Sequence, residues 1–161
     1  LDGSFIPCSP EELAVLLVQF LNERNINRIF AWDESQLPKR VPKGLYDNLR
    51  REGINIVDKI NPSIKVGLTG AFAGIASNAA LLLPSGAGRP LTASLLPEIH
   101  IAILDAKDIY PNLQDIFSKK ELFETTSVVL ISGPSRTADI EMTLTIGVHG
   151  PGEIRVYCLL D

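Results

Sequence analysis

The most constraining feature of this sequence is a series of short apolar runs with little polar alternation. Residues 79–83 (AALLL) are apolar on both faces that a strand would present, and residues 127–132 (SVVLIS) also lack strict alternation. Strands with one wet face alternate apolar and polar residues, whereas strands of parallel sheets are buried on both faces and form nearly continuous apolar runs. The sequence therefore predicts a sheet that is covered on both sides.

Helical segments separate these runs. Ser9 is placed to cap a helix, Pro10 suits its first position, and Glu12 completes a capping box. Apolar residues then repeat at helical spacing, at Leu13, Leu16, Leu17, Phe20 and Leu21. A second helix is expected over residues 42–51, ending at Gly53. Further helices are expected over residues 111–117 and 138–148.

Strands are expected between the helices, over residues 28–32, 54–57, 65–69, 79–83, 100–106, 127–132 and 154–160. The Gly-rich residues 70–77 are expected to form a tight loop with one helical turn, and residues 84–97 a longer loop. Strands that alternate with helices predict a mostly parallel sheet. We therefore expect one α/β domain over residues 1–161, with three α/β/α layers.

Composition excludes several classes of protein. The net charge of −4 gives no basic footprint for nucleic acid, and no apolar run reaches the roughly 18 residues of a membrane span. The two cysteines, Cys8 and Cys158, form no CxxC pair, so we expect buried thiols in a reducing cytoplasm and no resident iron–sulfur cluster. The chain starts at Leu1 rather than Met, so we expect an incomplete N-terminus.

The first candidate site is the segment 132–141 (SGPSRTADIE), which follows an apolar strand and is expected to open a helix. A helix N-terminus at the carboxyl end of a strand suits an anion, and arginine suits a carboxylate or phosphate. Asp139 and Glu141 would already satisfy the helix dipole, so a capped helix start without ligand is an equal alternative. The candidate residues are Ser132, Gly133, Ser135, Arg136 and Thr137.

The second candidate site is the loop 84–90 (PSGAGRP), in which Gly86 and Gly88 free the backbone and Arg89 supplies charge. A surface loop with a solvated arginine is the alternative. Because carboxyl ends of parallel strands share one edge, we expect both candidate segments to face one crevice that binds a small anion.

The remaining polar residues indicate no cofactor and no metal. His149 is expected at the end of the helix over residues 138–148, and His100 at the start of a strand. Neither has neighbours at ligand spacing for zinc, and no GxSxG motif supports a Ser–His–acid triad. The glycines Gly67, Gly70 and Gly74 do not form a dinucleotide-binding GxGxxG pattern.

Three stretches resemble a known family: residues 67–71 (GLTGA), residues 94–103 (SLLPEIHIAI), and SGPSRTADIE followed by GVHGP over residues 132–151. They resemble LUD-domain proteins of the lactate utilization protein C group. The resemblance implies a fold similar to that of the NagB/RpiA/CoA-transferase superfamily. It also implies a role in the oxidation of L-lactate to pyruvate, with iron–sulfur proteins as partners.

The chain departs from the family pattern at three positions after the first stretch. Phe72 stands where the family carries Asp, Ser77 where it carries Glu, and Ala79 where it carries Gly. Two alternatives therefore stay open. The chain could bind or convert a small phosphorylated or carboxylated metabolite by itself, or it could be a degenerate interaction module without a ligand.

Overall fold

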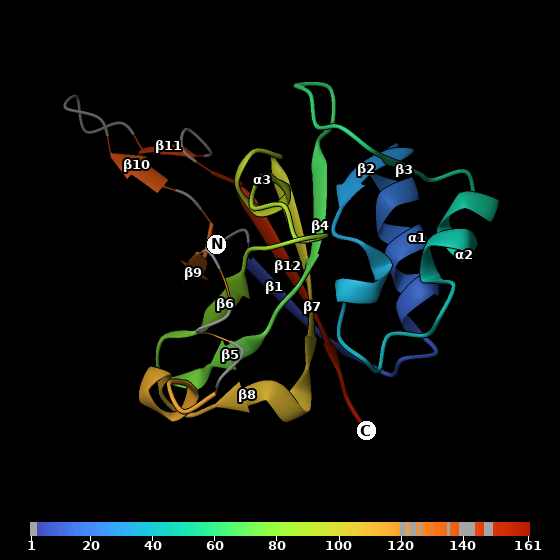
Figure 1. Ribbon diagram of the computed structural model, residues 1–161. Helices are drawn as coiled ribbons and strands as arrows, with labels where there is room; N and C mark the ends of the chain where they lie inside the picture. Colours follow the sequence, from blue (N-terminus) through green and yellow to red (C-terminus); the bar gives the residue numbers. More distant parts are fainter. Residues whose placement is uncertain are drawn as a thin grey trace.

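A computed structural model describes residues 3–119, 122, 125, 127–134, 136–138, 144–146 and 150–161. Within these residues the strands form a six-stranded sheet, a four-stranded sheet and a two-stranded pair. The larger sheet forms the centre of the molecule, between a helical side and the side of the smaller sheet (Figure 1). The expected α/β class with a mostly parallel sheet is confirmed.

Every neighbouring pair of strands in the six-stranded sheet is parallel. The order across the sheet is β1 (Gly3–Cys8), β12 (Glu153–Leu159), β7 (Ile99–Asp105), β4 (Val66–Gly70), β2 (Arg28–Ala31) and β3 (Asn55–Val57). In the centre, Leu68 of β4 lies opposite Ile101 of β7, and both side chains are fully buried. The continuous apolar residues Ile101–Leu104 of β7 follow from this burial on both faces.

Two helices, α1 (Leu13–Glu23) and α2 (Leu45–Arg51), lie on one side of this sheet (Figure 1). The two hydrogen bonds of the predicted capping box are present, because the Ser9 N–H donates to Oε2 of Glu12 at 2.8 Å and the Glu12 N–H donates to Oγ of Ser9 at 3.3 Å. They close a turn over residues 10–12, and α1 itself begins later than predicted, at Leu13. The second helix begins later than residue 42, at Leu45, after Gly44 with φ +80°. Gly53, with φ +83°, follows its end as predicted.

The other side of the sheet carries α3 (Thr92–Leu95) together with the four-stranded sheet (Figure 1). That sheet has the order β8 (Ile109–Tyr110), β5 (Ala73–Ile75), β6 (Ala80–Pro84) and β9 (Val128–Ile131). The buried strand expected over residues 79–83 therefore exists as β6, but it pairs antiparallel with β5 and β9 instead of joining the parallel sheet. Continuous apolar character reports burial, and it does not report strand direction.

Other expectations need correction. Residues 70–77 contain the strand β5, and the single turn follows at Ala76–Asn78. The helix expected over residues 111–117 is a short 3₁₀ helix, Leu113–Ile116. The helix expected over residues 138–148 is wrong, because β10 (Arg136–Ala138) and β11 (Leu144–Ile146) form an antiparallel pair. The period-two alternation and β-branched residues of Leu144–Ile146 favour a strand; residues 139–143 and 147–149 lie outside the described residues.

One position in the core must be glycine, because two backbone segments approach each other closely there. A Cβ on Gly67 of β4 would lie 1.7 Å from the carbonyl oxygen of Ala93 in α3. Only glycine lets α3 pack this near the sheet. On the same face, Oγ1 of Thr69 and Nε2 of His100 share a hydrogen bond of 2.8 Å, and both side chains are fully buried.

Candidate functional site

A crevice of about 530 Å³ lies at the carboxyl ends of β2, β4 and β7. The chain leaves β2 toward the α2 side of the sheet and leaves β4 toward the β5 side. This divergence is a topological switch point, where open parallel sheets place their ligands. The lining residues are Trp32, Gln36, Leu37, Pro38, Lys39 and Arg40 after β2, Gly70, Ala71 and Phe72 at the end of β4, Pro84 at the end of β6, Arg89 in the loop that follows it, and Asp105, Lys107, Asp108 and Lys119.

The loop that carries Arg89 is attached to the end of β2. The indole Nε1 of Trp32 donates to the carbonyl of Pro90 at 3.2 Å, and the Asp33 N–H donates to the carbonyl of Gly88 at 2.8 Å. Gly88 has φ +71°, and a Cβ there would lie 2.5 Å from Oδ2 of Asp33. The glycine is needed for this contact, which holds the neighbouring Arg89 against the crevice.

Arg89 has no charged partner among the described residues. Its Nε is buried without a hydrogen-bond acceptor there, and no carboxylate of the described chain forms an ion pair with it. A buried donor without an acceptor costs about 1–3 kcal/mol. Arg89 also lines the crevice, and guanidinium groups bind carboxylates and phosphates strongly, so the crevice offers an anion an arginine without an ion-pair partner among the described residues.

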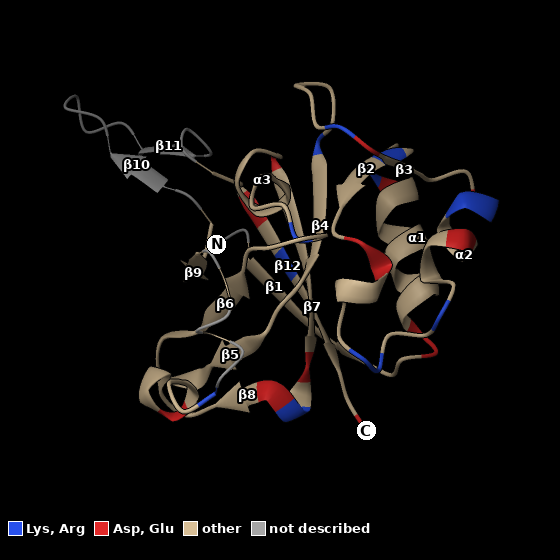
Figure 2. Cartoon of the chain, in the orientation of Figure 1, with Lys and Arg blue, Asp and Glu red and all other residues tan. Residues whose placement is uncertain are grey.

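Two other cations of the crevice, Arg40 and Lys107, already contact carboxylates at the end of β7, where Figure 2 shows acidic and basic residues close together. Arg40 contacts Oδ1 of buried Asp105 at 3.2 Å. Lys107 contacts Oδ1 of Asp161 at 3.0 Å, and hydrogen bonding to Lys107 lowers the pKa of the Asp161 carboxyl. Among the residues that the structure describes, five Lys and Arg side chains and two Asp side chains line the crevice, so it favours an anion.

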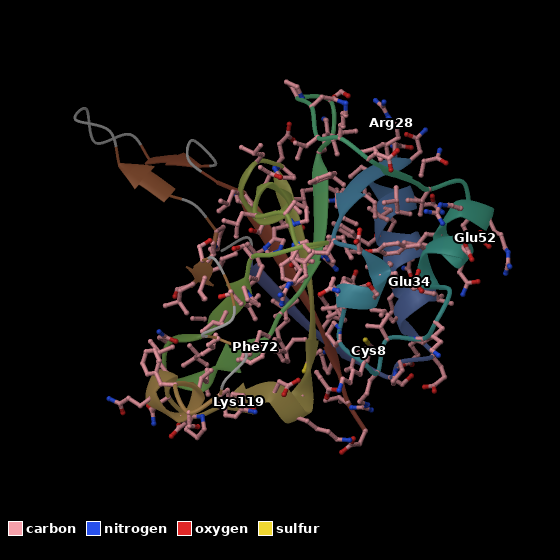
Figure 3. The ribbon with its side chains drawn as sticks, in the orientation of Figure 1. Cys8, Arg28, Glu34, Glu52, Phe72 and Lys119 are labelled. Carbon is pink, nitrogen blue, oxygen red and sulfur yellow. The ribbon has the colours of Figure 1, made fainter. Side chains whose placement is uncertain are left out.

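Asp108 differs from these groups because burial raises the pKa of its carboxyl, with a further contribution from the charge of Asp105. Lys119 and a hydrogen bond from Tyr110 oppose that rise. The Lys119 ammonium lies 4.8 Å from the centre of the Tyr110 ring. Figure 3 shows Lys119 and Phe72 near each other at this end of the molecule, and both line the crevice.

The two candidate segments do not share one crevice. β6 and β9 are antiparallel, with Pro84 opposite Val128 and Leu81 opposite Ile131, so the residues after each strand leave at opposite ends of the pair. Ser85, which follows β6, accordingly forms hydrogen bonds with Ser127, which precedes β9. Ser132 and Gly133 line a separate cavity of about 310 Å³ beside β1.

The other predicted site residues also lie in two different parts of the structure. Gly86 and Gly88 belong to the Arg89 loop, where Gly86 accepts the Arg89 N–H through its carbonyl at 2.9 Å. Arg136 and Thr137 belong to β10, so the anion site at a helix N-terminus is wrong, and Ser135 lies outside the described residues. Binding by either segment stays a prediction.

Sequence reasoning missed most of the crevice. Trp32 and Asp105 directly end correctly predicted strands, so the rule that ligands bind at carboxyl strand ends would have found them if applied to every strand. Arg40 gives no such signal, because its position depends on contacts with Asp105 and Leu159 that are distant in sequence.

His100 and the two cysteines lie apart from the crevice lining. Burial lowers the pKa of His100 to about 4, and burial raises the pKa of the Cys8 and Cys158 thiols. Both cysteines are free and buried, as expected. Within the described residues no group of three or more His, Cys, Asp or Glu is placed to hold a metal ion, and no described helix is long and apolar enough to cross a membrane. His149 lies outside the described residues.

The LUD domain family model matches residues 10–159, so the chain belongs to the LUD domain family. The chain is 30% identical over 145 residues to lactate utilization protein C of Halalkalibacterium halodurans, covering 81% of this chain and 62% of that protein. It is 39% identical over 101 residues to an uncharacterized protein of Neisseria meningitidis, covering 61% of this chain and 43% of that protein. The chain thus spans less than two thirds of the length of these relatives.

A solved structure shows the same fold. The crystal structure of a DUF162 family protein from Deinococcus radiodurans superposes with a TM-score of 0.66 at 15% identity, covering 98% of this chain and 88% of that chain. The mixed architecture of a parallel sheet with a smaller second sheet therefore agrees with an experimental fold.

Proposed function

We propose that this chain acts in the cytoplasm in the utilization of L-lactate, as the LUD domain of a protein that works with iron–sulfur partners in the oxidation of lactate to pyruvate. In this proposal the crevice at β2, β4 and β7 binds the carboxylate of a small anion of that pathway. The relatives named lactate utilization protein C support the pathway.

The Arg89 guanidinium, which lines the crevice without an ion-pair partner among the described residues, carries the proposal for the site. A carboxylate in the crevice would form charge-assisted hydrogen bonds with this guanidinium. Hydrogen bonds to charged groups contribute about 1.5–3 kcal/mol, which is roughly a tenfold or larger change in affinity.

Calorimetric titration with L-lactate and with pyruvate tests this site. Arg89→Gln should weaken binding of at least one of them about tenfold or more, with an unchanged melting temperature. Arg28→Gln is the matched control, because Arg28 lies far from Phe72 and Lys119 in Figure 3 and bonds only to exposed Ser63 among the described residues. Equal binding by wild type and Arg89→Gln would contradict the site.

The partner proposal needs a separate experiment. The full-length protein, co-expressed with iron–sulfur proteins of its own lactate-utilization genes, should co-elute with iron and with visible absorbance. Elution without iron under conditions where the iron–sulfur proteins are intact would contradict the partnership.

A second candidate function is independent binding of a larger phosphorylated metabolite. The crevice volume of about 530 Å³ favours it, because pockets of roughly 300–1,000 Å³ suit ligands much larger than lactate. Titration with sugar phosphates distinguishes the two functions. If the protein binds neither ligand class, the remaining alternative is an interaction module without a ligand. Phe72 in the crevice favours that alternative, because it stands where the resembled pattern carries an acid.

A further inference from the structure

Two cationic side chains of the crevice hold one carboxylate oxygen between them. Oδ1 of Asp161 lies 3.0 Å from Nζ of Lys107 and 3.4 Å from Nη1 of Arg40. Arg40 and Lys107 both line the crevice, whereas Asp161 does not. The Asp161 carboxylate therefore contacts these cations from the rim, in the way that an anionic group of a ligand could contact them.

The two cations differ in how firmly they are held. Arg40 is two-thirds or more buried and also donates to Asp105 and to the carbonyls of Leu159 and Leu160. The Lys107 and Asp161 side chains are 62% and 79% exposed. Water and salt screen an exposed pair of this kind, so it contributes little to stability. Asp161 can thus be displaced while Arg40 stays in place.

We propose that Arg40 and Lys107 form a second anion-binding subsite of the crevice, which Asp161 occupies when no ligand is bound. The ligand then carries two anionic groups, one bound by Arg89 and one by this subsite, as in a dicarboxylate or a phosphorylated carboxylic acid. The inference rests on the proposed function, which assigns the first group to Arg89. Asp105 neutralises the charge of Arg40, so Lys107 supplies the net positive charge of the subsite.

Calorimetric titration with malonate, succinate and glutarate, and with propionate and butyrate as monocarboxylates, tests the subsite. Asp161→Asn removes the competing carboxylate, so it should strengthen binding of at least one dicarboxylate about fivefold or more. Monocarboxylate affinities should stay within about twofold. Lys107→Met in the Asp161→Asn background should abolish the gain.

Glu52→Gln is the matched control, since it also removes one negative charge but lies at the outer end of α2, away from Phe72 and Lys119 in Figure 3. It should leave every affinity unchanged. An equal gain for monocarboxylates, or no gain for any dicarboxylate while Arg89→Gln still weakens monocarboxylates, overturns the subsite and leaves the proposed function standing. If Arg89→Gln has no effect on monocarboxylates, the proposed function itself fails.

Discussion

In the six-stranded sheet, β2, β4 and β7 run in the same direction, and the residues that follow them meet in one crevice. In the four-stranded sheet, β6 and β9 run in opposite directions, and the residues that follow them separate into two cavities. Both sheets contain short strands that are mostly apolar. Strand direction therefore decides which polar residues can act together, and local sequence does not reveal it.

Burial differs between the central strands of the larger sheet and β9, the edge strand of the smaller sheet. The central strands β4 and β7 are buried along their whole length, whereas Val128 and Leu130 of β9 are 42% and 45% exposed. The larger sheet supplies the rigid framework that positions Trp32, Gly70 and Asp105 around the crevice. We expect substitutions in these central strands and in the edge strand β9 to have very different effects.

The largest effect is expected at Gly67. In Gly67→Ala the new Cβ would lie 1.7 Å from a backbone oxygen of α3, so α3 must leave the sheet, at a cost of roughly 5 kcal/mol or more. Urea unfolding, or loss of folded protein on purification, measures it. Gly3→Ala in β1 is the control, because nothing lies closer than 4.0 Å to its Cβ. A mild effect at Gly67 would mean that α3 does not rest on β4.

Shortening one buried and one exposed side chain to alanine tests this difference in burial. Ile101→Ala should lower the free energy of unfolding by about 4 kcal/mol, since it leaves a cavity in a fully buried position. Leu130→Ala in β9 should cost less than about 1 kcal/mol. Similar losses at both positions would remove the distinction between the buried central strands and the exposed edge strand.

His100 predicts a dependence of stability on pH. Its folded pKa of about 4 lies below the ordinary value of 6.5, because burial disfavours the charged ring. The unfolded chain therefore binds more protons between these pH values, so stability is full above about pH 6.5 and falls as the pH drops toward 4. The loss should reach roughly 3 kcal/mol.

Urea unfolding at pH 7 and at pH 4.5 measures this loss, and His100→Gln should reduce it. His149→Gln serves as the control, because it removes the other histidine. An unchanged pH dependence in His100→Gln would show that the Thr69–His100 pair is not buried as described.

The smallest effect is expected between β5 and β6, at the turn of the smaller sheet. Ala79 has φ +51° and is exposed, a left-handed conformation that glycine adopts without strain. Ala79→Gly should therefore raise the free energy of unfolding by about 0.5–1 kcal/mol. Asn25, also at positive φ, provides a second position at which Asn25→Gly should gain less, because asparagine tolerates this conformation.

Much of the fold could be predicted from sequence, because capping, periodicity and apolar runs are local. The Ser9–Glu12 capping box and the strands around Phe30, Leu68 and Ile101 are examples. The antiparallel direction of β6 could not be predicted, because an apolar run reports burial alone. The sequence predicts the Arg89 loop as a candidate site because glycines and a cation stand together, and binding there stays a prediction. It also predicts that residues 132–137 face the same crevice, which is wrong because an apolar run does not reveal strand direction.

The most direct test of the account is a ¹⁵N NMR titration of the labelled protein with L-lactate. If the anion binds at the carboxyl edge of the parallel sheet, the Arg89 side-chain Nε–H and the amides of Gly70 and Phe72 should shift with a common affinity, while the amides of Ser132 and Gly133 stay unchanged. Shifts confined to Ser132 and Gly133, with none at Arg89, would contradict it.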